Sequence, residues 1–182
     1  MKKLTQSLFV VALLFAGSTA FAQTTSVGGE IMYPAKNIVE NAVNSKDHTT
    51  LVAAVKAAGL VETLQTAGPF TVFAPVNDAF ENLPAGTVEN LLKPENKATL
   101  STVLTYHVLS GNYDFAALEK AIKAGKGNAV LKTVAGEDLT FMMNGPRNIT
   151  VTDKNGNTAN ITTYDVRQQN GVIHVIDKVL LP

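Results

Sequence analysis

The sequence predicts an α+β fold, because helical signals fill its first half and strand signals fill its last third. In the segment 95–108, apolar residues recur at the i, i+3, i+4 and i+8 spacing of a core-facing helix stripe. The last third changes to short apolar runs separated by turn signals, of which Asn155-Gly156 is the clearest hairpin. No internal repeat or low-complexity segment interrupts the chain, so we expect one domain over residues 34–182.

The first 22 residues differ from the rest of the chain. Lys2 and Lys3 precede an apolar run from Leu8 to Ala16, and Ala20-Phe21-Ala22 matches a small-residue cleavage site. This pattern predicts a secretory signal peptide over residues 1–22, since the run is shorter than the roughly 20 apolar residues of a membrane span. Cleavage removes two of the 15 basic residues and none of the 15 acidic ones, which gives a net charge of −2. We therefore expect an exported protein, periplasmic or extracellular, without a transmembrane segment.

Helix signals follow a short tail. Residues 23–33 are small, polar and glycine-containing, and they predict a flexible segment. Helices are expected at about 47–59, 95–108 and 114–127, with shorter helical turns between them, and a strand is expected at 70–73. Five polar residues stand where helix N-caps are expected: Asn37, Asp47, Asn77, Thr87 and Asp114.

Six short runs in the last third are typical of strands with alternating faces. Turn residues at Gly136, Gly145, Gly156 and Gly171 separate most of them. The predicted strands are 130–134, 139–143, 149–153, 159–163, 172–176 and 179–181.

Composition excludes several kinds of chemistry. The chain has no cysteine, which removes disulfides, thiolate metal sites and cysteine nucleophiles. No serine has the Gly-x-Ser-x-Gly context of a hydrolase, and no glycine pattern is typical of a phosphate-binding loop. Residues 153–157 match the opening of a calcium loop but lack its later glycine and glutamate, so they predict a hairpin. We expect no enzyme activity, metal or cofactor, and the balanced charge argues against nucleic acid as a partner.

The three histidines call for different interpretations. His48 falls in the first turn of a predicted helix, where we expect it to be solvated. His107 lies on an apolar stripe and His174 lies inside an apolar strand. Because an unpaired buried polar group costs about 1–3 kcal/mol, we expect both rings to be buried and hydrogen-bonded.

Three motifs resemble the signatures of the fasciclin domain family. Residues 70–80 (FTVFAPVNDAF) are similar to its first conserved block, and residues 170–182 (NGVIHVIDKVLLP) are similar to its closing block. Between them, residues 104–109 (LTYHVL) resemble its tyrosine–histidine motif, and residues 51–60 resemble its opening helix. The resemblance covers about residues 36–182.

The resemblance implies a seven-stranded β-sandwich or wedge flanked by several short α-helices. It assigns structural roles to Thr71, Asn77, His174 and Asp177, and it implies that His107 bonds back toward the first block. In animal relatives the tyrosine–histidine region is implicated in integrin binding, so Tyr106 and His107 are candidate partner-binding residues. The family is associated with adhesion and contact with the extracellular matrix.

One segment stands out as specific to this chain. The predicted helix 114–127 carries Lys120, Lys123 and Lys126, and residues 115–135 have a net charge of +3. We interpret these lysines as candidate contacts to an acidic partner, such as a polysaccharide. The resulting hypothesis is an exported, non-enzymatic module that binds a cell-surface or matrix protein or polysaccharide. The alternative is a carrier of a small apolar ligand, such as a carotenoid or lipid.

Overall fold

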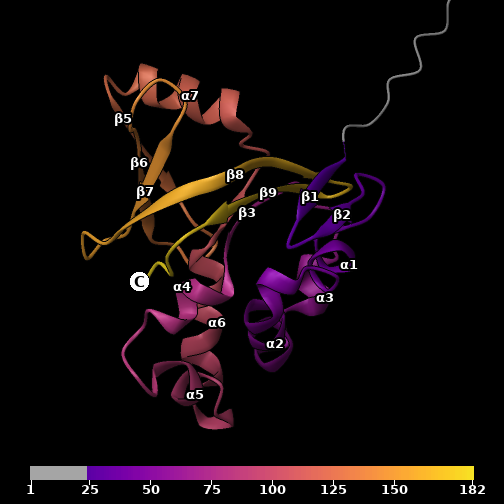
Figure 1. Cartoon of the computed structure of the whole chain (residues 1–182). Helices are drawn as coiled ribbons and strands as arrows, with labels where there is room; N and C mark the ends of the chain where they lie inside the picture. The colour runs from indigo at the N-terminus through magenta and orange to yellow at the C-terminus, as the bar shows by residue number, and fades with distance from the viewer. Residues whose placement is uncertain (1–23) are drawn as a thin grey trace, which may run out of the picture.

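The computed structural model describes residues 24–182, in which strands and short helices follow one another along the chain (Figure 1). The predicted signal peptide, residues 1–22, lies outside the described residues. The elements are β1 (Thr25–Val27), β2 (Glu30–Met32), α1 (Ile38–Ala42), the 3-10 turn η1 (Lys46–His48), α2 (Thr49–Ala58), α3 (Val61–Leu64), β3 (Phe70–Pro75), α4 (Asn77–Glu81), α5 (Thr87–Leu91), the 3-10 turn η2 (Pro94–Asn96), α6 (Lys97–Tyr106), β4 (Val108–Ser110), α7 (Phe115–Ala124), β5 (Asn128–Lys132), β6 (Asp138–Met143), β7 (Ile149–Thr152), β8 (Thr158–Gln168) and β9 (Gly171–Ile176).

Seven strands form one mixed sheet in the order β4-β3-β9-β8-β7-β6-β5. Neighbouring strands are antiparallel except β3 and β9, which run parallel. The register of β8 shifts between Ile161 and Val166, and such irregularities bend a strand. The sheet therefore turns over along β8, and a bridge between Leu109 and Thr133 brings its two edges together. The predicted α+β class and seven-stranded wedge are confirmed. One bent sheet supplies both layers of the wedge.

The helices divide between two sides of the central strands (Figure 1). Helices α1 to α6 lie on one side of β3 and β9, whereas α7 lies beside β5 and β6 at the other end of the molecule. The two sides have separate cores. Leu51, Leu104 and Ile173 belong to the core beneath α2 and α6, and Leu118 and Phe141 belong to the core beneath α7.

The segment 23–33 differs from the flexible tail that its composition predicts. Its described part forms the antiparallel hairpin β1–β2, which turns at Gly28 and Gly29 with positive φ angles of 60° and 77°. Val27 and Met32 leave only 9% and 3% of their surface exposed and join the core beneath α2. Val27 and Met32 flank the Gly-Gly turn, but a signal of two apolar residues is short, and the polar residues around it hide it.

Two of the five expected helix caps act where the sequence places them. Asn37 forms a capping box with Glu40, and the Asp114 side chain accepts a hydrogen bond from Ala117 N. Asp47 and Thr87 do not cap: His48 precedes α2 and Gly86 precedes α5.

Asn77 caps a different helix from the one expected. It is the first residue of α4, and its Oδ1 accepts from Thr50 N at 3.1 Å, in the first turn of α2. Its Nδ2 donates to Lys46 O at 2.8 Å. The cap therefore joins two helices that are 27 residues apart, a pairing that local spacing does not contain.

The strand boundaries also shift in places. Strand β3 extends to Pro75 and β8 to Gln168, because each has a neighbouring strand along that length. Residues 179–181 are not a strand. Within residues 24–182, no helix is long and apolar enough to cross a membrane.

The Asn77 cap predicts a loss of stability on substitution. Asn77→Ala is expected to lower the free energy of unfolding by about 1–2 kcal/mol, because Thr50 N and Lys46 O lose their partner. Urea denaturation measures this change. Asn82→Ala is the control, since Asn82 is exposed and its side chain forms no hydrogen bond within the described residues. An equal loss in the two variants would contradict the cap.

Candidate functional site

His107 lies where three parts of the chain meet. It follows α6, and its Nδ1 donates to Val103 O at 2.8 Å in the last turn of that helix. Its Nε2 accepts from Leu180 N at 3.0 Å, and its main-chain carbonyl accepts from Phe73 N at 2.9 Å. The expected bond toward the first block is therefore made by the main chain, whereas the ring binds the closing segment. Because one ring nitrogen donates and the other accepts, this arrangement requires a neutral ring.

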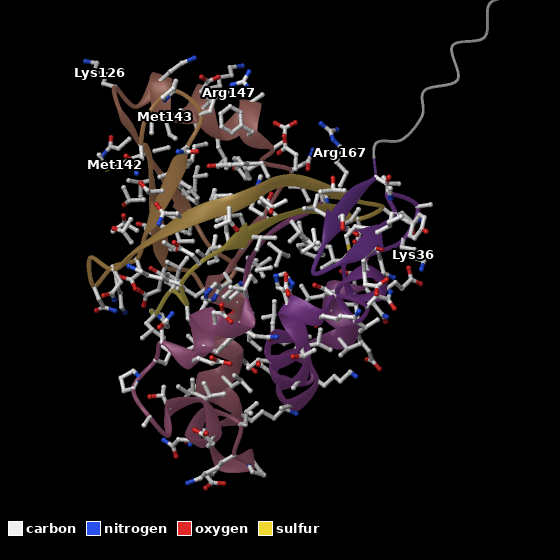
Figure 2. All side chains as sticks on the ribbon, viewed as in Figure 1. Lys36, Lys126, Met142, Met143, Arg147 and Arg167 are labelled. Carbon is white, nitrogen blue, oxygen red and sulfur yellow. The ribbon has the colours of Figure 1, made fainter. Side chains whose placement is uncertain are left out.

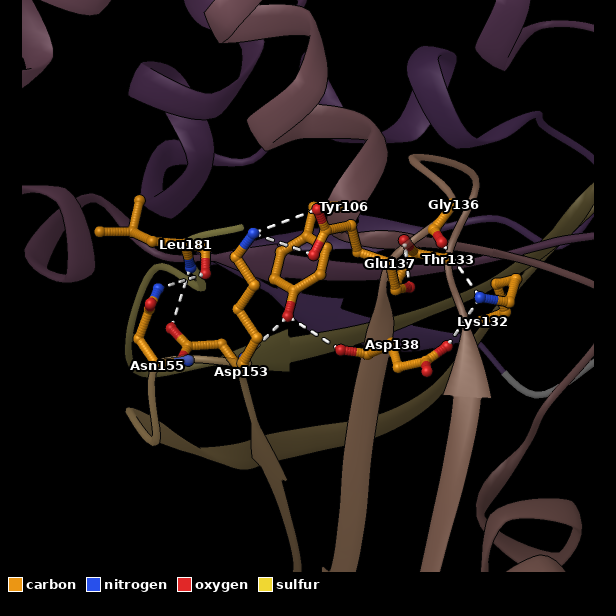
Figure 3. A network of polar contacts seen from close by, with 10 residues as sticks. Tyr106, Lys132, Thr133, Gly136, Glu137, Asp138, Asp153, Asn155 and Leu181 are labelled. Atoms are coloured by element: carbon orange, nitrogen blue, oxygen red, sulfur yellow. Dashed lines mark hydrogen bonds and ion pairs between the residues drawn. The ribbon is translucent and has the colours of Figure 1, made fainter.

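Tyr106 is fully buried beside His107. Its hydroxyl donates to Asp138 O at 2.9 Å and accepts from Lys154 N at 3.1 Å (Figure 3). Burial raises the pKa of Tyr106 above its ordinary value of 10, which keeps this donor protonated. His107 is only 3% exposed. Neither side chain of the tyrosine–histidine motif is therefore at the surface, and a partner at this region would touch their neighbours.

Asp153 organises the hairpin beside this motif. Its carboxylate accepts from Asn155 N, Asn157 N and Asn157 Nδ2 within the turn, and from Leu181 N at the end of the chain. The turn predicted at Asn155-Gly156 is confirmed, and it also anchors the C-terminal residues (Figure 3). Within residues 24–182, no group of three His, Asp or Glu side chains is placed to hold a metal ion.

The other motif residues hold neighbouring segments together. Thr71 Oγ1 donates to Gly111 O and accepts from Tyr113 N, both at 2.8 Å. His174 Nε2 donates to Tyr113 O at 2.8 Å, and its ring stacks on Phe73. The two side chains thus fix the same loop between β4 and α7. Asp177, in contrast, binds Asn160 through both carboxylate oxygens at 2.7 Å.

His48 is buried, which corrects the expectation of a solvated ring. It is 3% exposed, and its Nδ1 lies 2.8 Å from Ser45 Oγ. Its Nε2 is buried without a hydrogen-bond partner. Burial lowers the pKa of His48 below 6.5, and the nearby backbone of Ala74 and the charge of Asp47 oppose this shift. The hairpin β1–β2 lies close by: a Cβ on Gly28 would come within 2.5 Å of Ser45 Oγ.

Five exposed basic residues lie on or near α7, and we call them together the basic face: Lys120, Lys123, Lys126, Arg147 and Arg167. Lys123 pairs with Glu119 at 2.8 Å and Arg167 with Asp114 at 3.6 Å, whereas the other three form no ion pair within the described residues. Figure 2 shows Lys126 and Arg147 at the α7 end of the molecule.

Arg147 belongs to this face because of the tertiary structure. It lies in the turn before β7, where Ile149 N donates to the Tyr164 hydroxyl at 2.7 Å. The Tyr164 ring packs edge-on against Phe115 at the start of α7. The local sequence indicates the lysines of α7 but contains no signal for Arg147, which is 21 residues beyond Lys126.

An apolar cleft lies on the opposite side of the central strands. It encloses about 90 Å³ between helices α1 to α3, strand β3 and the end of α6. Ala42, Val52, Leu64, Phe70 and Val108 are among its lining residues. No local pattern in the sequence predicts the place of this cleft, since these residues are as far as 66 positions apart.

Comparisons with known proteins agree with the geometry. Residues 46–182 match the Fasciclin domain family. Protein sll1483 of Synechocystis sp. is 50% identical over 148 residues, covering 81% of this chain and 74% of that protein. Cell surface glycolipoprotein MPB83 of Mycobacterium bovis is 32% identical over 177 residues, covering 93% and 72%. A solved FAS1 domain pair from the insect cell adhesion molecule Fasciclin I matches with a TM-score of 0.71 at 18% identity, covering 81% of this chain and 51% of that one.

The pairing of His107 predicts a pH-dependent stability. Burial lowers the pKa of His107 from 6.5 to about 4, with Val103 O and Asp153 opposing the shift. Between these values the unfolded chain binds a proton that the folded chain does not, so stability falls as the pH falls from 6.5 to 4. One pKa unit corresponds to about 1.4 kcal/mol, so His107 alone accounts for a loss of about 3 kcal/mol across this window.

The variant His107→Gln isolates this contribution. It is expected to be less stable at pH 7, and its free energy of unfolding should change less between pH 6.5 and pH 4. Urea denaturation at several pH values measures both quantities. Part of the slope should persist, since burial also lowers the pKa of His48 and of His174. If the free energy of unfolding of the variant fell with pH as steeply as that of the unaltered protein, the assignment to His107 would be contradicted.

Proposed function

The chain belongs to the fasciclin domain family, and from this premise we propose that it is an exported, non-enzymatic binding module that acts in surface adhesion. The names of two matched proteins, a cell surface glycolipoprotein and a cell adhesion molecule, support this proposal. None of the matched proteins named above is called an enzyme. The predicted signal peptide provides the route of export.

The basic face is the observation that carries the choice of partner. Lys120, Lys126 and Arg147 are exposed and form no ion pair within the described residues. Cations without a partner on their own chain are free to bind the carboxylates or sulfates of a polymer. We therefore propose an acidic polysaccharide at a cell surface or in a matrix as the partner, and the attraction should weaken as salt increases.

Lys126 lies at the position where α7 ends. Its φ of 57° is in the left-handed region, where a side chain costs about 1–2 kcal/mol relative to glycine. Gly127 follows immediately, and α7 ends with its C-cap at Gly125. The left-handed conformation of Lys126 therefore ends α7, with Gly127 N donating to Ile122 O and Lys126 N donating to Lys123 O.

Three charge-removing substitutions test the basic face. The triple variant Lys120→Gln, Lys126→Gln and Arg147→Gln is expected to bind polygalacturonate about tenfold more weakly, a loss of about 1.4 kcal/mol. Cells that produce it should also attach less to surfaces coated with this polymer. Calorimetry at low and high salt measures the affinity, with neutral dextran as the probe for charge-independent binding.

The matched control removes three cations elsewhere. Lys36, Lys93 and Lys178 are exposed, and none forms an ion pair within the described residues. Replacing these three with glutamine changes the net charge equally and should leave the affinity within twofold. Equal losses in both triple variants would show that net charge alone attracts the polymer. Lys126→Gly adds a second readout, since relief of strain should raise its stability while its affinity falls.

The apolar cleft favours a second candidate function, the carriage of an apolar ligand. A concave site lined by apolar side chains suits such a molecule. Protein purified from its native source should then carry an extractable lipid or a coloured compound. Mass spectrometry and visible absorption of an organic extract test this, and a colourless preparation without extractable lipid would contradict it.

A further inference from the structure

The cleft beneath α1 to α3 takes its apolar lining from several elements. Val27 of the β1–β2 hairpin, Val55 of α2 and Val134 beyond β5 all line it. Val43 and Val134 are each 47% exposed, so apolar surface continues from the enclosed part toward solvent.

The charge at the cleft is positive. Lys56 is the only residue with a formal charge among the described residues that line it, and none of them is acidic. Lys56 lies in the last turn of α2, is exposed, and forms no ion pair within residues 24–182. Its stem can therefore cover apolar wall while its ammonium stays in water at the mouth.

A second lysine lies beside the end of α2. Lys97 Nζ, at the start of α6, is 3.2 Å from the position that a Cβ on Gly59 would occupy. Gly59 is the C-cap of α2, three residues after Lys56. Lys97 also forms no ion pair within the described part of the chain. Lys56 therefore lines the cleft, and Lys97 adds a second positive charge near the C-cap of α2.

We propose that this cleft binds a single-chain anionic amphiphile of the fatty-acid class. The alkyl chain lies along the apolar walls, and the carboxylate lies at the mouth near Lys56, with Lys97 adding to the positive field. The proposal rests on the carrier function and gives its ligand a charge and a shape. It is independent of the basic face around α7.

The chain and the headgroup contribute differently to affinity. Each methylene removed from water should raise the affinity about fourfold, so the affinity increases from octanoate to decanoate to laurate until the cleft is filled. An exposed ion pair should add only about two- to fivefold. The alkyl chain of the ligand therefore determines most of the affinity, and the lysines determine the preference for an anion.

Calorimetry with laurate and dodecanol separates the contribution of the alkyl chain from that of the charge. The two probes have the same number of carbons, but only laurate is charged. The unaltered full-length protein should bind laurate two- to fivefold more tightly than dodecanol at low salt. Lys56→Gln should abolish this preference and leave dodecanol binding unchanged, whereas Lys56→Arg should retain it. Lys93→Gln is the charge-matched control, since Lys93 does not line the cleft.

A blocking variant tests the place of binding. Ala42 lines the cleft from α1, and Ala42→Phe should lower the affinity for both probes at least tenfold. Its melting temperature shows whether the fold is intact, and Val52→Phe provides a second block from α2 if it is not. Laurate affinity that persists in folded blocking variants would overturn the proposed location.

The remaining outcomes distinguish the two proposals. Equal affinities for laurate and dodecanol, unaffected by Lys56→Gln, would overturn the anionic ligand and leave the carrier function standing. Binding of neither probe, together with a lipid-free native preparation, would overturn both.

Discussion

His107 joins the three motifs into one core through its ring and its main chain. Its two nitrogens connect the end of α6 to the segment after β9, and its carbonyl pairs with the first block in β3. These links need a neutral ring in a site that excludes water, and burial lowers the pKa of His107 to about 4. Strand β3, the α6 helix and the chain end are therefore held by a residue whose ring is neutral at pH 7.

A bend in one strand separates the two candidate functions. Because β8 pairs with β7 in its first part and with β9 in its second, one sheet supplies two cores. The core beneath α7 supports the basic face, and the core beneath α2 borders the apolar cleft. Substitutions at one side should therefore leave the other side intact, since distant sites without shared partners act nearly additively.

Much of the fold could be predicted because its signals are local. The caps at Asn37 and Asp114, the stop at Gly59 and the turn at Asn155-Gly156 each depend on a few neighbouring residues. The β1–β2 hairpin could not be predicted, since Val27 and Met32 form a strong signal only when the core that they cover is known. The sequence predicts a solvated His48 for the same reason, because its position in the first turn of a helix contains no information about the hairpin beside it.

The sequence by itself determined the α+β class, the family resemblance, the buried state of His107 and His174, and the positive charge of the α7 segment. Local hydrogen bonding, apolar periodicity and side-chain chemistry act over a few residues, so the linear sequence contains them. Only the tertiary structure decided that Arg147 lies near α7, that Asn77 caps α2, and that Lys56 lines an apolar cleft. These arrangements depend on how the sheet bends at β8 and where the helices pack against it, and those are long-range consequences of packing that no local pattern records.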